Sequence, residues 1–246
     1  KIGNDQFGSM ATEIYKNSGV DYSNVIISKE YSTGAAGILV NEQTGANAIN
    51  VFPGASGEIT NDDIDEAEET IKNSKIFLTQ LEAPKDVVLY ALKKANNFNV
   101  TTIFNPAPAI EIDETVFPLI DYFTPNETEA SFYVDHKVET FEDAEKAAVQ
   151  LIEKGIKNVV ITLGEKGAFF ANRKNKFSLP VANLSNPVVD TTGAGDAFNA
   201  GFAVALTEGQ KIKDALRFAS ATAGLSTTKI GTANSMPSRE EIDKLL

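Results

Sequence analysis

NVVITL, residues 158–163, is the stretch of this sequence that decides its fold class. The run is almost continuously apolar and rich in Val and Ile, which is typical of a strand covered on both faces. The segment before it, residues 141–155, repeats small and apolar residues at helical spacing and stops at Gly155. These repeated residues are Ala144, Ala147, Ala148, Leu151 and Ile152. A helix that leads into such a strand predicts a parallel sheet with helices on both sides.

The same alternation extends over most of the chain. Further strands are expected at residues 24–28, 36–41, 46–52, 74–80, 99–104, 121–124 and 167–172. Further helices are expected at residues 5–17, 61–72, 84–97, 126–133, 194–208, 211–228 and 239–245. From residue 74 onward, strands and helices alternate. Residues 24–52 hold successive strands without a helix, so we expect an antiparallel excursion that partly returns to the main sheet.

Composition excludes several classes of function. The chain has 246 residues, enough for one large α/β domain or two small domains. Its net charge of -12 argues against a broad surface for nucleic acid, which needs clustered Lys and Arg. It contains no cysteine, which excludes disulfides and thiolate metal sites and fits a cytoplasmic location. No apolar run approaches the ~18 residues that a membrane span needs.

The turns that follow the strands are the candidate functional site, because open parallel sheets bind ligands beyond the carboxyl ends of their strands. The turn DTTGAGD, residues 190–196, precedes a predicted helix. Gly193, Ala194 and Gly195 leave their backbone N–H groups open to an anion at the helix N-terminus. Asp196 suits a base that takes a proton from an attacking hydroxyl. The alternative is that Asp196 only caps the helix.

VVDTTGAGDAFNAGF, residues 188–202, closely resembles the C-terminal signature of the ribokinase-like (PfkB) sugar kinases. The resemblance continues in family order through GANAINVFPGA, TQLEAP, FNPAPA, TPNETEA, ITLGEKGAFF and GTANSMPSREEI, nearly the whole chain. QLE and NPAPA point to the ribokinase branch of the family. The resemblance implies a three-layer α/β/α fold with a mostly parallel central sheet and a small β-sheet lid. It also implies ATP-dependent phosphorylation of a sugar, with the 5-hydroxyl of D-ribose as the expected acceptor.

The resemblance assigns roles to single residues. Asp196 becomes the catalytic base, and the N–H groups of Gly193, Ala194 and Gly195 become the anion hole for the transferring phosphoryl group. Glu82 becomes a sugar ligand, together with Asp196; the alternative for Glu82 is a solvated loop carboxylate. The implied nucleotide-binding residues are Asn126, Thr162, Gly164, Gly167 and Gly195. Lys166 is the side chain of an exposed turn, with a phosphate contact as the alternative.

The resemblance also implies two metal ions. Asn126 and Glu129 of the N-x-x-E spacing would hold Mg²⁺, mostly through water. The same spacing is that of a capping box, and both readings can hold together. A monovalent cation, K⁺, would lie beside the anion hole, held largely by backbone oxygens of Asp190, Thr192, Ser226, Lys229, Gly231 and Ser235. The only histidine, His136, receives no role.

The beginning of the chain departs from the family pattern. The family starts with a strand, part of the lid and a Gly-Gly-x-x-Asn segment that grips the sugar, whereas this chain starts at KIGNDQFG. We therefore expect a single domain, residues 1–246, that lacks its N-terminal portion and has lid strands at about 24–41. Alone it would bind nucleotide but be nearly inactive, and a homodimer through the lid is expected of the complete protein.

Three alternatives remain open at this point. The first is another sugar or nucleoside kinase of the same family, fructokinase-like or adenosine kinase-like. The second is a non-catalytic nucleotide-binding fragment. The third, a dinucleotide-binding oxidoreductase, is disfavoured because the G-x-G-x-x-G turn is absent.

Overall fold

A computed structural model describes residues 1–40 and 47–246, which form two compact units. Unit 1 comprises Lys1–Asn73 and Leu81–Ala91, and unit 2 comprises Ser74–Gln80 and Leu92–Leu246. The expected strands at 36–41 and 46–52 each have one end, residue 41 and residue 46, outside the described residues. Gly45, the first residue of the motif GANAINVFPGA, also lies outside them. The expectation of one domain with a lid at about 24–41 stays a prediction.

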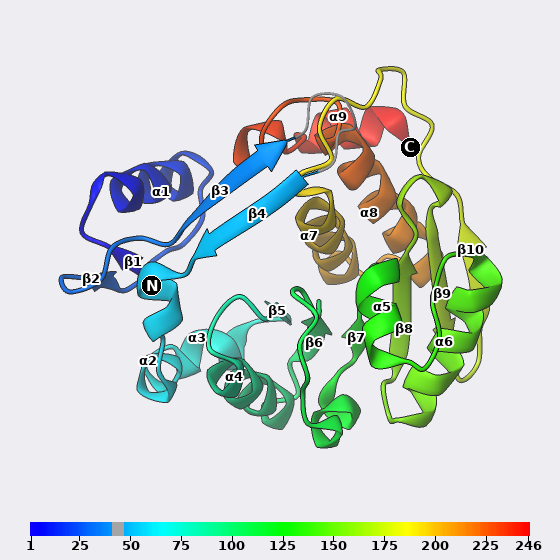
Figure 1. Cartoon of the computed structure of the whole chain (residues 1–246), viewed down its shortest axis with the longest axis horizontal. Coiled ribbons are helices and arrows are strands. Elements are labelled where there is room, and N and C mark those ends of the chain that lie inside the picture. The colour runs from blue at the N-terminus through cyan, green and yellow to red at the C-terminus, as the bar shows by residue number, and fades with distance from the viewer. Residues whose placement is uncertain (41–46) are drawn as a thin grey trace. The chain divides into compact units, whose positions relative to one another are not determined.

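Unit 2 is built on a six-stranded sheet with the order β10-β9-β8-β7-β6-β5 (Figure 1). Its strands are β5 (Ile76–Thr79), β6 (Thr101–Phe104), β7 (Tyr122–Phe123), β8 (Asn158–Thr162), β9 (Ala168–Asn172) and β10 (Lys176–Leu179). The pairs from β5 to β8 are parallel, whereas β9 and β10 are antiparallel to their neighbours. The expected mostly parallel α/β sheet is therefore confirmed.

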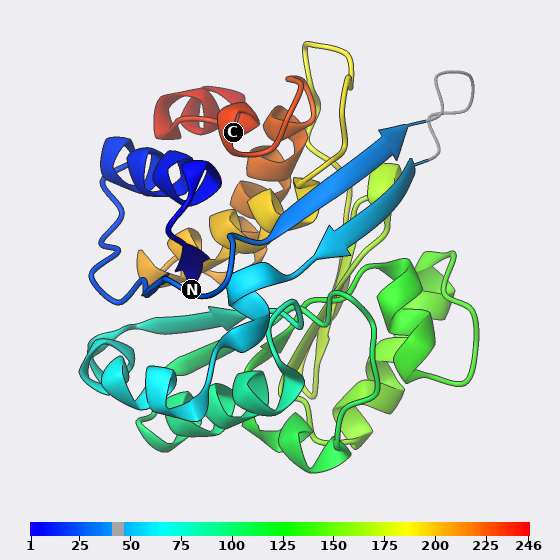
Figure 2. The same ribbon diagram turned by 60° about the vertical axis from the view of Figure 1, so that its left-hand side comes forward.

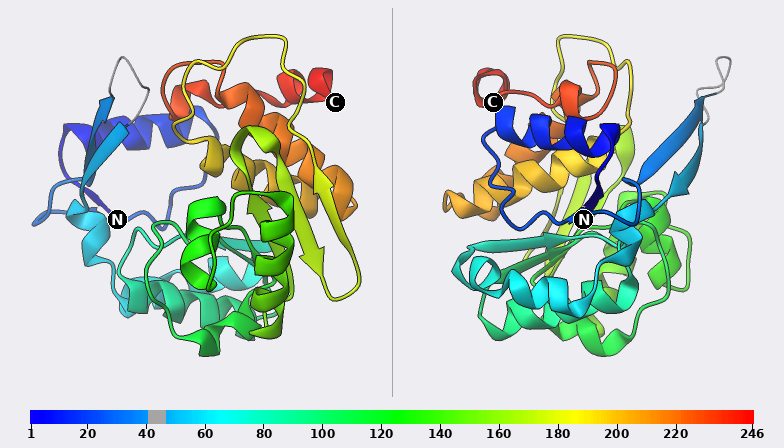
Figure 3. Two further views of the ribbon diagram at one scale, coloured as in Figure 1. Left: turned by 45° about the vertical axis from the view of Figure 1, so that its right-hand side comes forward. Right: turned by 90° about the vertical axis from the view of Figure 1, so that its left-hand side faces the viewer.

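Helices cover both faces of this sheet. They are α4 (Lys85–Asn97), whose C-terminal part belongs to unit 2, α5 (Glu127–Tyr133), α6 (Phe141–Glu153), α7 (Ala194–Thr207) and α8 (Ile212–Ser226). The last helix, α9 (Arg239–Leu245), packs against α8. In the left view of Figure 3, α6 lies in front of β8 and β9, and α8 lies behind them. The fully buried side chains of Phe170 and Phe202 belong to one core cluster that joins the sheet to α7 and α8. This cluster packs the sheet against α7 and α8.

Short 3-10 turns complete unit 2. They are η2 (Glu114–Leu119), η3 (Gly164–Lys166) and η4 (Ala233–Ser235). The turn η3 lies directly after β8, and η4 follows α8. Only η3 therefore lies in a turn that follows a strand, where the candidate site was expected.

Unit 1 is smaller and contains short elements. It holds β1 (Ile2–Gly3), α1 (Gln6–Asn17), β2 (Ile27–Ser28), β3 (Ala35–Val40), β4 (Asn47–Phe52), η1 (Gly54–Glu58), α2 (Asn61–Glu66) and α3 (Glu68–Asn73). The strands β3 and β4 run antiparallel as a pair (Figure 2). Asp5 caps α1 and also accepts hydrogen bonds from Thr33 through its backbone N–H and its hydroxyl, each at 2.7 Å. This carboxylate therefore fixes the start of α1 to the segment before β3.

Three sequence predictions were wrong in detail. The expected antiparallel excursion fails for β2, which pairs in parallel with β1, and in the described residues β3 and β4 form a separate sheet. The expected helix at 61–72 is two helices that break at Ala67, within an acidic run whose like charges disfavour one continuous helix. The strand β10 was missed because its pairing with β9 at the edge of the sheet, and not a continuous apolar run, defines it.

Candidate active site

Three neighbouring parallel strands of unit 2 end beside one another, and polar side chains follow each of them. Gln80 follows β5, Asn105 follows β6, and Thr124 follows β7. Asn126 forms an isolated bridge with Thr162 at the end of β8, so this row continues to a fourth strand. The parallel arrangement of these strands is what gathers residues far apart in the sequence at one edge.

The N-terminus of α7 carries open backbone donors. Gly193 is the N-cap residue, with φ 78° and ψ 4°, a left-handed conformation that favours glycine. The N–H groups of Gly193 and Gly195 have no hydrogen-bond acceptor within the described part of the chain, whereas Ala194 donates to the carbonyl of Thr191 at 3.2 Å. A Cβ on Gly195 would meet no atom within 4 Å, so this side is open. The helix end can therefore accept an anion.

Asp196 lies in the first turn of α7 and is exposed. It is not the N-cap, since Gly193 holds that position, so the alternative that Asp196 only caps the helix is wrong. Its Oδ1 accepts a hydrogen bond from Nε2 of Gln80 at 3.0 Å. The carboxylate is thus held beside the open N–H groups of the same helix.

A partly buried hydrogen-bond network lies behind Asp196. Nε2 of Gln80 also donates to Oδ1 of Asn105 at 3.3 Å, and Nδ2 of Asn105 donates to the carbonyl of Thr124 at 2.8 Å. The hydroxyl of Thr124 donates to Oδ1 of Asn199 at 2.6 Å, and Nδ2 of Asn199 donates to the carbonyl of Gly195 at 3.0 Å. The network therefore joins the ends of β5, β6 and β7 to the first turn of α7.

Asn126 and Glu129 form a capping box at the start of α5, which confirms that prediction. Oδ1 of Asn126 accepts from the Glu129 N–H at 2.8 Å, and Oε2 of Glu129 accepts from the Asn126 N–H at 2.8 Å. Oε2 also accepts from Nδ2 of Asn105 at 3.4 Å. Burial raises the pKa of the Glu129 carboxyl above its ordinary value. The spacing thus has a structural role, which leaves metal binding as an additional proposal.

A cavity of about 490 Å³ opens beside the N-terminus of α7. All five residues that the resemblance assigned to nucleotide binding line it: Asn126, Thr162, Gly164, Gly167 and Gly195. Apolar side chains line another part, among them Val181, Leu184, Val188 and Ala223. A mostly apolar cavity with a few polar groups at one end is typical of a small-molecule site.

The residues assigned to the monovalent cation lie before α7, at the end of α8 and in the segment from there to η4, and hydrogen bonds join these segments. Asp190 accepts from the Thr192 N–H at 2.9 Å through Oδ1 and from the Gly231 N–H at 3.0 Å through Oδ2. The bond from Gly231, followed by those from Thr192, lowers the pKa of the Asp190 carboxyl. Ser226 and Ser235 are buried, and the hydroxyl of each donates to a nearby carbonyl. Lys229 forms an ion pair with Glu241 at 2.9 Å.

Glu82 belongs to unit 1, where it is exposed in the turn before α4. The structure describes this unit by itself, so the assignment of Glu82 to the sugar stays a prediction.

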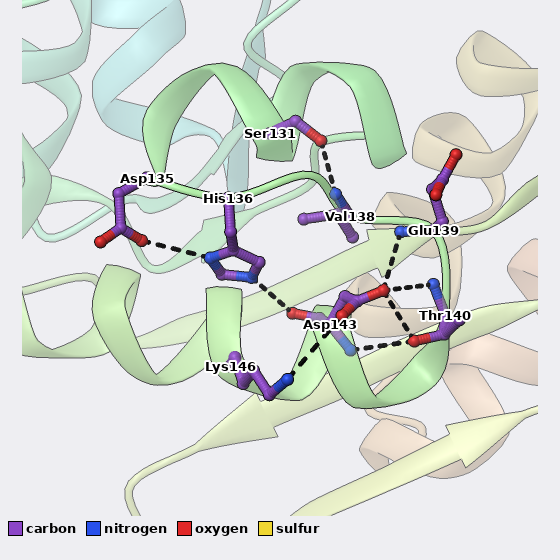
Figure 4. Close-up of polar contacts among 8 residues, drawn as sticks. All are labelled: Ser131, Asp135, His136, Val138, Glu139, Thr140, Asp143 and Lys146. Atoms are coloured by element: carbon purple, nitrogen blue, oxygen red, sulfur yellow. Dashed lines mark hydrogen bonds and ion pairs between the residues drawn. The ribbon is translucent and has the colours of Figure 1, made fainter.

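The loop between α5 and α6 is structural (Figure 4). His136 lies between the Asp135 carboxylate, at 3.3 Å, and the Asp143 carbonyl, at 3.1 Å. Asp143 closes a capping box with Thr140 at the start of α6. Lys166 is exposed and donates to the backbone carbonyl of Glu139 at 2.6 Å. The exposed turn expected for Lys166 agrees with its contact, whereas the expectation that His136 has no role stays a prediction.

Sequence reasoning missed several site residues. Gln80 and Asn105 stand in the turns TQLEAP and FNPAPA but received no role, and Asn199 was taken only as part of a helix. Glu127 and Thr191 also line the cavity without having been predicted. The available signal was position alone, because a polar residue directly after a buried parallel strand faces the ligand edge.

Open backbone donors beside an exposed carboxylate suit phosphoryl transfer, where the protein positions groups and stabilises charge. An α/β unit with this arrangement fits the class of phosphotransferases. The family of pfkB carbohydrate kinases matches residues 1–239, and the chain belongs to this family. The chain is therefore an enzyme that phosphorylates a sugar hydroxyl.

Individual relatives agree with this membership. A ribokinase of Haemophilus influenzae is 36% identical over 240 residues, which cover 98% of this chain and 78% of the relative. The crystal structure of a ribokinase from Thermotoga maritima has a TM-score of 0.87 and 39% identity, covering 99% of this chain and 78% of the other. Arabidopsis thaliana ribokinase complexed with ribose and ATP has a TM-score of 0.89 and 31% identity, covering 99% and 79%.

None of the described helices has the length and apolar character that are needed to cross a bilayer.

Proposed function

We propose that this chain transfers the γ-phosphoryl group of ATP to the 5-hydroxyl of D-ribose, giving ribose 5-phosphate. The observation that carries the proposal is that one helix N-terminus, that of α7, adjoins the 490 Å³ cavity and carries the exposed Asp196 in its first turn. The proposal is supported by the similar ribokinases, of which one structure is complexed with ribose and ATP.

ATP would occupy the cavity of unit 2. Its phosphates would face Asn126, Thr162, Gly164, Gly167 and Gly195, which line the cavity. Its base would contact the apolar part, near Val181 and Leu184. The separation of polar and apolar lining supports this orientation of the nucleotide.

Asp196 would act as general base and take the proton of the attacking hydroxyl. The backbone N–H groups of Gly193, Ala194 and Gly195 would stabilise the charge on the transferring phosphoryl group. Those of Gly193 and Gly195 have no other acceptor in the described residues, whereas that of Ala194 would exchange its bond to Thr191 for one to the phosphoryl oxygens. Glu82 would accept hydrogen bonds from sugar hydroxyls.

Two cations fit the donor groups present. Asn126 and Glu129 would hold Mg²⁺ through water, since both Glu129 oxygens already accept hydrogen bonds at 2.8 and 2.9 Å from Asn126. When bound, Mg²⁺ would neutralise phosphate charge. K⁺ would be held by the six residues Asp190, Thr192, Ser226, Lys229, Gly231 and Ser235. The bonds of Asp190 to Thr192 and Gly231 support this assignment by fixing both loops.

We also propose a cytoplasmic enzyme that forms a homodimer through the lid. The strands β3 and β4 carry large apolar side chains that are strongly exposed, Leu39 at 74% and Phe52 at 61%. Large exposed apolar residues on a short sheet favour association with another surface.

The proposed reaction is tested by ADP release with a panel of acceptors: D-ribose, 2-deoxyribose, fructose and adenosine. We expect ribose to give the highest kcat/KM. A higher kcat/KM for another acceptor would replace ribose while keeping the enzyme class. ATP binding without turnover on any acceptor would instead agree with the expectation that the chain binds nucleotide but is nearly inactive alone, or with a non-catalytic nucleotide-binding protein.

A further inference from the structure

The contact between Gln80 and Asp196 joins residues that are 116 positions apart in the sequence. The Asp196 carboxylate is exposed in the first turn of α7, whereas Asn105, on the other side of Gln80, is only 6% exposed. The amide of Gln80 therefore bridges a rigid buried group and a carboxylate on the surface.

The orientation of the Gln80 amide is fixed by its neighbours. An ionised carboxylate only accepts hydrogen bonds, so the NH₂ group must face Asp196. Oδ1 of Asn105 must also act as an acceptor, because Nδ2 of Asn105 donates to the Thr124 carbonyl and to Glu129 at 2.8 and 3.4 Å. Both hydrogens of the Gln80 amide are thereby used, one on each side.

This bridge restricts the Asp196 carboxylate without blocking it. Only Oδ1 accepts a hydrogen bond from a residue of unit 2, and within that unit no donor contacts Oδ2. A proton acceptor must be held in line with the attacking hydroxyl, since misplacement by ~1 Å can cost about 10²-fold in rate. The Gln80 bond holds one oxygen in place and leaves the other for the substrate.

The same bridge reaches the nucleotide side of the site. Asn105 contacts Glu129, and Glu129 closes the capping box with Asn126, which lines the cavity. A continuous path of hydrogen bonds therefore runs from Asp196 through Gln80 and Asn105 to the N-x-x-E spacing.

We propose that Gln80, anchored by Asn105, is a positioning residue that orients the Asp196 carboxylate relative to the residues around the ATP phosphates. The inference rests on the proposed function, in which Asp196 is the base. Gln80 acts through Asp196 and need not touch the substrate.

The test compares three variants in ribose-dependent ADP release. Gln80→Leu removes both donors and leaves an apolar side chain that is one atom shorter. We expect it to lower kcat by about 10–100-fold and to leave KM for ATP within twofold. Gln80→Glu keeps the shape but places a second carboxylate beside Asp196, and we expect at least the same loss. The matched control is Gln150→Leu, which removes another Gln-to-Asp hydrogen bond, 2.8 Å long, on the exposed face of α6.

A double mutant separates positioning from a merely structural role. If Gln80 acts through Asp196, then Gln80→Leu should change turnover by less than twofold in an Asp196→Asn background. The same factor in both backgrounds would overturn the inference, and so would turnover of Gln80→Leu and Gln80→Glu within threefold of the parent. Loss of turnover in Asp196→Asn with full turnover in both Gln80 variants overturns this inference alone. Absence of turnover in the parent overturns the proposed function as well.

Discussion

Replacing Gly193 with Ala tests whether the conformation of the α7 N-cap matters for turnover beyond its effect on stability. Gly193 has φ 78°, where an alanine is strained by ~1–2 kcal/mol. The lower entropy of the unfolded alanine chain offsets ~0.4–1 kcal/mol of this strain. The added Cβ would also lie 3.3 Å from Cγ2 of Thr232, which must move slightly. We expect a net loss of about 1 kcal/mol in the free energy of unfolding.

The same helix provides a matched control. Gly209, just beyond the C-terminal end of α7, also has φ 78°, and a Cβ there would meet nothing within 4 Å. Gly209→Ala should therefore lose about the same stability, with a fall in Tm of ~2–4 °C per kcal/mol for a chain of this size. Its distance along the helix from the open N–H groups predicts unchanged turnover.

The two variants should differ in turnover. To relieve the strain at Gly193, the backbone must rotate, which turns the adjoining N–H groups away from the transferring phosphoryl group. Loss of one such donor lowers kcat by ~10²–10³-fold. Thermal melts and ribose-dependent ADP release on both variants provide the assay. Equal kcat values for the Gly193→Ala and Gly209→Ala variants would refute the reasoning, because strain alone would then explain every effect.

Three further predictions concern the cations, the buried carboxylate and the cavity. Because Asp190 joins the two proposed cation loops, K⁺ should activate turnover above Na⁺ or a large organic cation at matched ionic strength, and identical rates would remove this site. Burial raises the pKa of Glu129, so the folded state binds its proton more tightly than the unfolded state does. The contribution of this carboxyl to the free energy of unfolding should therefore fall as pH rises above 4.5, its ordinary pKa. Denaturant unfolding of the parent and of Glu129→Gln at several pH values measures this contribution. The free energy of unfolding of the parent should fall relative to that of the variant as pH rises, and a constant difference would contradict the prediction. Gly224→Val should raise KM for ATP by about tenfold, since even its Cβ would lie 3.0 Å from Leu184 in the cavity wall. Lys213→Val, an exposed change on the same helix, is the control, and an equal KM for both variants would argue against this cavity as the nucleotide site.

The sequence predicted those parts of the fold that depend on local pattern. Continuous apolar runs located β5 and β8, and the turn before residue 194 located the start of α7. Apolar runs and turn residues involve neighbouring positions, so they can be recognised in a single sequence. The break at Ala67 and the short strand β10 were not predicted, because charge repulsion and tertiary pairing decided them.

The candidate site was predictable only in outline. The residues of the glycine turn and of the N-x-x-E spacing are close in sequence and were found through their motifs. The link from Gln80 through Asn105 to Asp196 depends on which strands are neighbours in the sheet, and no local spacing encodes that contact. The side-chain hydroxyl of Thr124 and its bond to Asn199 were missed for the same reason.

The central claim is that Asp196 removes the proton of the sugar hydroxyl, and one paired measurement on Asp196→Asn tests it most directly. Calorimetry with a non-hydrolysable ATP analogue gives nucleotide affinity, and ribose-dependent ADP release gives turnover. We expect an affinity within a few-fold of the parent and a turnover lower by ~10²–10⁴-fold, the range for a general base. Turnover within a few-fold of the parent, at unchanged affinity, would contradict the role of Asp196.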